Sequence, residues 1–124
     1  MLDQARVIAF VATSSPERSR AFYQQTLGLR LVSEDRFAIV FDANGTMLRV
    51  QKVQTHTPPP YTGLGWDVAD VHGTVEALSD RGVVLERFEG MGQDEAGVWT
   101  SPAGGRIAWF RDPDGNTLSV TQFS

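Results

Sequence analysis

Imidazole and carboxylate side chains at a helical spacing are the first chemistry-bearing feature of the sequence. His72 and Glu76 are four residues apart in a segment expected to be helical, a spacing that a metal ion can use. Two ligands are too few for a metal site, so an exposed pair on one helix face is the simpler interpretation. The only other histidine, His56, lies in a proline-rich segment.

Other catalytic and cofactor signatures are missing. The chain has no cysteine, which excludes disulfides, thiolate zinc sites, iron–sulfur clusters and a cysteine nucleophile. No Gly-x-Ser-x-Gly motif is present, and no Gly-x-Gly-x-x-Gly motif or P-loop follows an expected strand. The sequence therefore predicts no nucleotide cofactor and no serine hydrolase triad.

Composition and charge limit the class of protein further. The 124 residues are 41% hydrophobic and 21% charged, as in a single globular domain. Fifteen acidic against eleven basic residues give a net charge of −4, which would repel a nucleic acid. No apolar run approaches the ~18 residues of a membrane span, and the N-terminus lacks a signal-peptide pattern, so we expect a cytoplasmic protein with no membrane partner.

Hydrophobic periodicity and turn residues predict the elements that position these side chains. In the first half, we expect a strand at 6–13 and then a helix that begins with a hydroxyl cap at Ser14-Ser15 and ends at Gly28. Three further strands follow, at 29–34, 36–42 and 46–53. Asn44-Gly45 predicts a tight hairpin. The second half repeats this order after the proline-rich segment 54–62. We expect a strand at 64–68, a helix from Asp70 to Leu78 and a strand at 83–88. A Gly-rich loop at 89–104, with a short strand near 97–100, precedes the last two strands at 105–111 and 117–122.

The two halves are an internal repeat. Arg36–Val50 matches Arg106–Val120 at a shift of 70 residues, and the first strands match at a shift of 55. Each half is strand–helix–strand–strand–strand, which predicts an α+β fold in which one helix covers one face of each sheet. We expect one domain, 1–124, made of repeats 1–53 and 63–124 joined by linker 54–62.

Motifs within the repeat identify a family resemblance. Ala21-Phe22-Tyr23 with Leu27-Gly28-Leu29, and Asp112-Pro113-Asp114-Gly115-Asn116 before the last strand, resemble the vicinal oxygen chelate superfamily of glyoxalases, bleomycin-resistance proteins and extradiol dioxygenases. The resemblance implies two βαβββ modules whose curved sheets enclose a small-molecule cavity. It also implies a homodimer, with sheets that pair within a chain or across chains.

The resemblance further implies four metal-ligand positions, usually held by His and Glu. They correspond here to Ile8, to Gly63 or its neighbour Leu64, to Arg49 and to Ser119. Hydrocarbon, hydrogen, a fixed positive charge and a neutral hydroxyl do not make a divalent metal site. We therefore expect no metal and no other cofactor.

With these positions as anchors, strand alternation assigns residues to the cavity. The predicted ligand-binding set is Ile8, Phe10, Met47, Arg49, Gln51, Gly65, Asp67, Trp99, Thr117 and Ser119. Arg49 would grip a ligand carboxylate or phosphate, pair with Asp67, or cover an aromatic ring. Asp67 is the candidate general base, or a solvated carboxylate. Loop 89–104, with Met91 and Trp99, is either a lid or a long loop held down by these side chains.

Together with these residues, the resemblance implies a metal-independent small-molecule binding protein of the bleomycin-resistance type, acting in drug or metabolite sequestration and hence in antibiotic resistance. Three alternatives stay open. One is a superfamily lyase, isomerase or dioxygenase that works through acid–base groups such as Asp67. Another is a metal enzyme with displaced ligands such as His56. The last is a structural or regulatory module whose cavity is closed.

Overall fold

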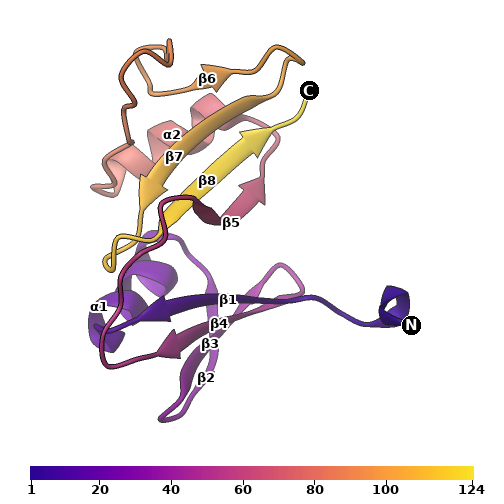
Figure 1. Ribbon diagram of the computed structural model, residues 1–124, viewed down its shortest axis with the longest axis vertical. Helices are drawn as coiled ribbons and strands as arrows, with labels where there is room; N and C mark the ends of the chain where they lie inside the picture. Colours follow the sequence, from indigo (N-terminus) through magenta and orange to yellow (C-terminus); the bar gives the residue numbers. More distant parts are fainter. The chain divides into compact units, whose positions relative to one another are not determined.

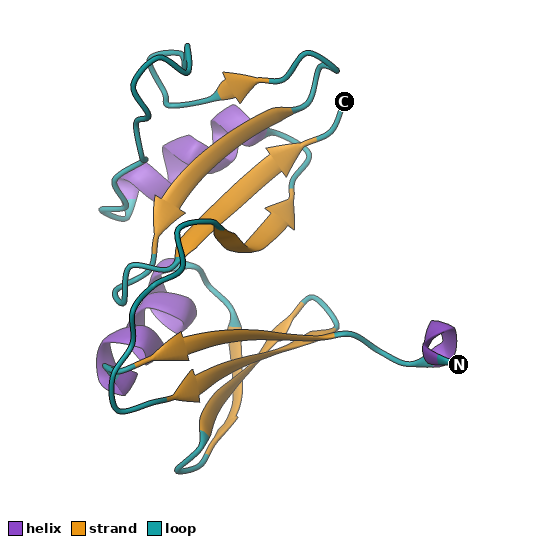
Figure 2. Ribbon diagram, viewed as in Figure 1, coloured by secondary structure: helices purple, strands orange, loops and turns teal.

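The protein consists of two compact units. The computed structural model describes all residues from Met1 to Ser124, and it divides into unit 1, Met1–Thr57, and unit 2, Pro58–Ser124. Each unit is a four-stranded mixed sheet with helical structure (Figures 1 and 2). The predicted α+β class with two modules is confirmed. The division falls inside segment 54–62, where the sequence predicts a linker.

Unit 1 has the strand order β1-β4-β3-β2, with β1 and β4 parallel and the other pairs antiparallel. Its buried side chains include Tyr23, whose ring centroid is 5.8 Å from that of Phe41. Its elements are η1 Leu2–Gln4, β1 Ile8–Thr13, α1 Pro16–Ala21, the π-helical turn η2 Phe22–Thr26, β2 Arg30–Glu34, β3 Ala38–Ala43 and β4 Thr46–Lys52.

The start of α1 differs from the expected hydroxyl cap. Ser15 is the N-cap residue, but its side chain makes no capping hydrogen bond. Instead, Thr13 Oγ1 accepts hydrogen bonds from the Ser15 backbone N–H at 3.0 Å and from Ser19 Oγ at 2.9 Å. Thr13 is fully buried, so these two bonds join the end of β1 to α1 without capping the first turn of the helix.

Unit 2 has the matching strand order β5-β8-β7-β6. The Asp70 side chain accepts a hydrogen bond from the Gly73 backbone N–H at 3.1 Å, which confirms the predicted cap of α2. Its elements are β5 Thr62–Asp67, α2 Val71–Asp80, β6 Trp99–Thr100, β7 Arg106–Arg111 and β8 Thr117–Gln122.

The predicted strand at 83–88 is wrong. This segment forms no strand and gives β7 a single backbone hydrogen bond, from Glu86 N–H to the Trp109 carbonyl at 2.8 Å. The side-chain amide of Gln93 forms hydrogen bonds with nearby backbone groups. It accepts from the Phe88 N–H and donates to the carbonyls of Glu86 and Gly97. A side chain therefore replaces the strand ladder, and the short β6 fills the edge position next to β7.

The two hairpins differ by one residue, and this changes the register of the repeat. In unit 1, Ala43 pairs with Thr46 across Asn44-Gly45, both with positive φ, as a two-residue turn requires. In unit 2, the Asp112 N–H bonds to the Asn116 carbonyl, which leaves a three-residue loop. The 70-residue shift therefore holds for β8 but becomes 69 for β7. A slip of one residue exchanges the two faces of a strand, so the ungapped repeat misassigns β7.

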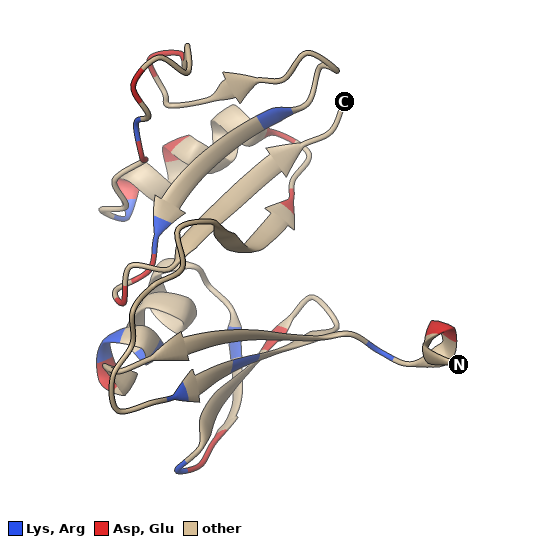
Figure 3. Ribbon diagram, in the orientation of Figure 1, with Lys and Arg blue, Asp and Glu red and all other residues tan.

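Charged residues lie largely on loops and at the ends of elements (Figure 3). In unit 2, β7 begins at Arg106 and ends at Arg111, so it carries a basic residue at each end. The longest helix is α2, with ten residues. No helix has both the length and the apolar composition that crossing a bilayer requires.

Candidate ligand site

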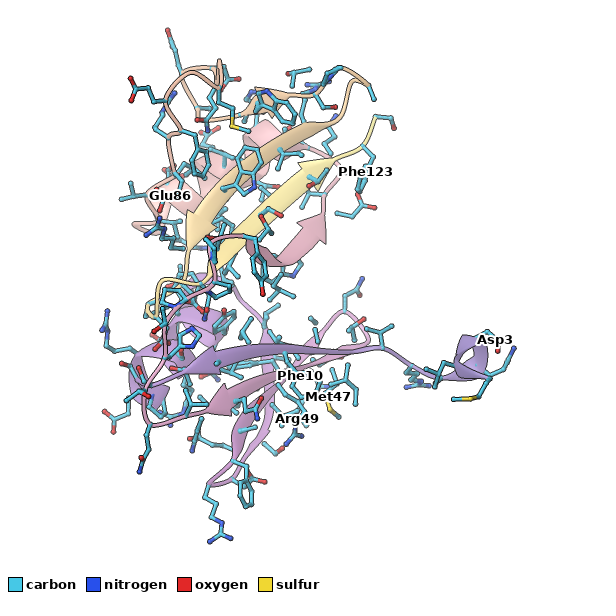
Figure 4. All side chains as sticks on the ribbon, in the orientation of Figure 1. Asp3, Phe10, Met47, Arg49, Glu86 and Phe123 are labelled. Atoms are coloured by element: carbon cyan, nitrogen blue, oxygen red, sulfur yellow. The ribbon has the colours of Figure 1, made fainter.

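The predicted residues of unit 1 share the face of the sheet that no helix covers. β1 and β4 pair Ile8 with Met47, Phe10 with Arg49 and Ala12 with Gln51. The side chains of the intervening residues Leu48 and Val50 are fully buried on the opposite face. Figure 4 shows Phe10, Met47 and Arg49 close together on this unit.

This open face of unit 1 combines exposed apolar surface with one cation. Ile8, Phe10 and Met47 are 46%, 54% and 42% exposed. Arg49 is half-buried, and it takes no part in the ion pairs of the unit, which use other charged residues. A guanidinium that forms no ion pair remains available to a carboxylate or phosphate.

In unit 2, Gly65 pairs with Ser119 and Asp67 pairs with Thr121. Ser119 alternates along β8 with the buried Leu118 and Val120, so it lies on the opposite face, the open face of this sheet, where it is 7% exposed. A Cβ at Gly65 would be 2.6 Å from Ser119 Oγ, so the absence of a side chain at Gly65 provides room for this hydroxyl. Asp67 is exposed at the end of β5, and the structure gives its carboxylate no hydrogen-bond or ion-pair partner.

Unit 2 has an open pocket of about 830 Å³ at the end of β7 and the start of β8. Of the predicted set, Thr117 lines it, whereas Gly65, Asp67, Trp99 and Ser119 do not. The proline segment forms one wall and the loop after residue 87 forms another. The lining is Pro58, Pro59, Pro60, Tyr61, Thr62, Phe88, Glu89, Gly90, Met91, Trp109, Arg111, Gly115 and Thr117.

Trp109 is a pocket residue that the sequence reasoning missed. Under the 70-residue shift it matches Ile39, which is fully buried in unit 1, whereas the observed register places it opposite Ser119 on the open face. Its ring packs against Phe88 edge-on at 5.5 Å and against Trp99 at 6.2 Å between centroids. Trp99 thus contacts the indole of Trp109 instead of lining the pocket. The extra residue in the Asp112–Asn116 turn was the sequence signal for this register.

Arg111 is the cation of the pocket, and it was also missed. Its Nε donates to Glu86 Oε1 at 2.7 Å, and Glu86 does not itself line the pocket. The Arg111 side chain is 58% exposed. Figure 4 shows Glu86 beside the end of β7 at which Arg111 lies. The ion pair fixes one edge of the guanidinium and leaves its two terminal nitrogens for other partners.

The loop after residue 87 is pinned by side chains. His72 Nε2 lies 2.8 Å from Asp94 Oδ2, and Asp94 Oδ1 accepts from the backbone N–H groups of Ala96 and Val98. Burial raises the pKa of the Asp94 carboxyl, but the bonds from His72, Val98 and Ala96 outweigh burial and leave that pKa below its usual value. His72 therefore anchors this loop, and its observed partner is Asp94 instead of Glu76.

The residues at the expected metal positions do not fit a metal. In unit 1 these positions hold the apolar Ile8 and the cationic Arg49, which offer no metal-ligating atom. In unit 2 the only side-chain oxygen at these positions is the buried neutral hydroxyl of Ser119. The pairing of β5 with β8 makes Gly63 the residue at a register shift and sets Thr62 opposite Thr117. Nowhere do three or more His, Cys, Asp or Glu side chains come together as a ligand group.

Comparison with known proteins identifies the family. The sequence profile of the Glyoxalase/Bleomycin resistance protein/Dioxygenase superfamily matches residues 4–120, and the chain belongs to this superfamily, which is the vicinal oxygen chelate superfamily. The resemblance seen in the sequence is thereby confirmed. No curated protein matches the sequence significantly.

Solved structures share the fold at low sequence identity. A glyoxalase family protein from Enterococcus faecalis aligns with a TM-score of 0.74 and 16% identity, over 98% of this chain and 100% of that one. Lactoylglutathione lyase from Agrobacterium tumefaciens aligns with a TM-score of 0.73 and 16% identity, over 95% of this chain and 93% of that one. A superfamily member from Sphaerobacter thermophilus aligns with a TM-score of 0.72 and 22% identity, over 94% of this chain and 96% of that one. At these identities the likeness establishes the fold alone.

Proposed function

We propose that this protein binds a small organic molecule without a metal ion, in the manner of the bleomycin-resistance members of its superfamily. The observation that carries the proposal is the chemistry at the four family metal positions, where Ile8, Gly63, Arg49 and Ser119 replace imidazoles and carboxylates. Arg49 bears a positive charge that would oppose a divalent cation. Sequestration of a drug or a metabolite is the corresponding role.

The open faces of both sheets support binding of an organic ligand. Unit 1 offers Phe10 and Met47 beside the unpaired Arg49, and unit 2 offers a pocket of about 830 Å³ with aromatic and proline walls and a few polar groups. Apolar walls with a small number of placed polar groups are typical of small-molecule sites.

The exposed apolar face of unit 1 also favours a homodimer, because contiguous apolar surface of this kind is usually covered by a partner. The acid–base alternative gains no support. Asp67 is exposed, so the structure does not show the enclosed position that a carboxylate general base needs.

Thermal-shift measurements in EDTA test the proposal. The protein is screened against bleomycin-like drugs, aromatic acids and glutathione conjugates, and a ligand at 100 times its dissociation constant should add about 2.7 kcal/mol of stability. We expect a stabilising compound in EDTA, with a weaker effect in Arg49→Gln when an anionic compound binds to the open face of unit 1. The matched control is Arg6→Gln, an exposed arginine that precedes β1. A panel that shifts melting only after metal is added would overturn the proposal.

A further inference from the structure

We propose that the pocket of unit 2 takes a planar aromatic monocarboxylate, whose ring lies on the Trp109 indole and whose carboxylate binds the Arg111 guanidinium. This inference rests on the proposed function and specifies the ligand class for one of its two open faces. It uses Trp109, Arg111 and Glu86, none of which belongs to the family's metal positions.

The aromatic ring of the ligand is inferred from the way Trp109 is held. Phe88 meets the indole edge-on, with an interplanar angle of 86°, and Trp99 lies against it at 37°. A ring fixed by two neighbours loses little side-chain freedom when a ligand stacks on it. Trp109 and Phe88 both line the pocket, so the fixed indole presents surface to a ligand there.

The proline wall favours a flat ligand for the same reason. Pro58, Pro59 and Pro60 form a stiff wall whose conformation costs little entropy to maintain. Gly115 lets this wall approach the hairpin loop: its φ is +83°, and a Cβ there would meet Pro58 Cγ at 3.2 Å. Two stiff apolar surfaces, indole and prolines, suit a rigid planar molecule more than a flexible chain.

The carboxylate is inferred from the geometry of Arg111. Glu86 binds Nε at 2.7 Å, which orients the guanidinium and leaves its terminal nitrogens without a protein partner. A planar guanidinium recognises a carboxylate through two parallel hydrogen bonds. Glu86 thus acts as a positioning residue for Arg111.

The charge around the pocket favours a ligand with one negative charge over a ligand with two. Glu86 already balances the one cation of the lining, and Glu89 adds a carboxylate to the lining. A phosphate dianion would meet net negative charge in this pocket, whereas a monocarboxylate exploits the directed hydrogen bonds of Arg111 with less repulsion.

Isothermal titration calorimetry with two isosteric probes tests the inference. The probes are 2-naphthoate and the neutral 2-naphthamide, titrated into the full chain. We expect naphthoate to bind more tightly, and Arg111→Gln to weaken naphthoate about tenfold or more but naphthamide, whose neutral carbonyl accepts a weaker hydrogen bond, much less. Glu86→Gln should give a smaller loss for naphthoate alone, and Trp109→Leu should weaken both probes.

The matched control is Arg106→Gln, on the same strand but on its other face and outside the pocket, which should leave both affinities unchanged. Arg111 is exposed, so its variant should fold, and circular dichroism checks this. Equal loss in Arg106→Gln and Arg111→Gln, or equal binding of the two probes, would overturn the inference. If a different class of compound binds in the thermal-shift panel while naphthoate does not, the inference fails and the proposed function stands. If no compound of the panel binds, both fail.

Discussion

Trp109 of β7 lies directly opposite Ser119 of β8, so an indole neighbours the position where metal-dependent relatives are expected to place their last ligand. Ser119 is buried and Gly65, its neighbour on the other side, has no side chain. This row of the sheet is therefore filled by a large ring, a hydroxyl and a glycine, in place of the charged ligands that a metal needs.

We predict that Gly65→Ala destabilises unit 2. Its Cβ would lie 2.6 Å from Ser119 Oγ and 3.4 Å from the Ser119 carbonyl, which forces a shift in a buried region. Overpacking of this kind typically costs about 1–3 kcal/mol, and urea denaturation would measure the loss. The double variant Gly65→Ala/Ser119→Ala should recover part of the loss because the nearer atom is gone.

Gly63→Ala is the control for this prediction. No atom lies within 4 Å of a Cβ at Gly63, and its φ is not positive. It should change the free energy of unfolding little. Equal losses from the two glycine variants would show that backbone freedom, and not the contact with Ser119, determines the effect at Gly65.

We predict that Glu34 makes the stability of unit 1 depend on pH. Arg20 donates two hydrogen bonds to this carboxylate at 2.6 and 2.7 Å, and Lys52 lies 2.7 Å from it. Arg20 first, and then Lys52, lower the pKa of Glu34 from 4.5 to about 2. Since the folded-state pKa is the lower one, the stabilisation is complete above pH 4.5 and is lost as pH falls toward 2.

Glu34→Gln should therefore cost about 1 kcal/mol at pH 7, a value limited by the partial exposure of the cluster. Urea titrations at pH 7, 4 and 3 should show the gap between wild type and variant closing with acid. Glu17→Gln, which removes a carboxylate of α1 that makes no ion pair, serves as the comparison. A gap that is the same at pH 7 and pH 3 would contradict the assignment.

We predict that His72→Ala loosens the loop after residue 87 without unfolding the unit. The 2.8 Å contact from His72 to Asp94 joins this loop to α2, and both side chains are nearly half exposed. Hydrogen exchange of the Ala96 and Val98 amides, which bond to Asp94, should accelerate while global stability changes by less than about 1 kcal/mol. Glu76→Gln, one turn further along α2, should leave this exchange unchanged.

We predict a dimer whose formation depends on the open face of unit 1. Light scattering after gel filtration should give twice the 13.6 kDa of one chain. Phe10→Glu places a charge in this apolar face and should reduce the mass to that of one chain, whereas Phe37→Glu, at an exposed position in the β2–β3 turn, should not. A wild-type protein with the mass of one chain would contradict the prediction.

Sequence patterns predicted the architecture well because each signal was local. The Asn44-Gly45 turn, the Asp70 cap and the alternation along β1 and β4 all depend on residues a few positions apart, and the structure confirms them. The strand at 83–88 failed because its hydrogen-bond partner is a side chain, Gln93, that lies beyond a turn. Periodicity contains no information on such a contact.

The pocket was harder to predict than the fold for a related reason. One extra residue in the Asp112–Asn116 turn moves Trp109 and Arg111 to the open face, and an ungapped repeat hides that shift. Thr117 follows the turn, keeps the 70-residue spacing, and was placed on the correct face. The pairing of Arg111 with Glu86 joins residues from a strand and an irregular segment, which sequence spacing does not reveal.

Metal content, measured by inductively coupled plasma mass spectrometry on protein purified without added metal or chelator, distinguishes a metal-free binding protein from a metal enzyme. We expect far less than one equivalent of zinc, nickel, iron or manganese per chain, because Ile8, Gly63, Arg49 and Ser119 offer no ligand set. One equivalent of any of these metals, retained through gel filtration and lost in a variant of His56 or Asp67, would contradict this expectation and point to a displaced metal site.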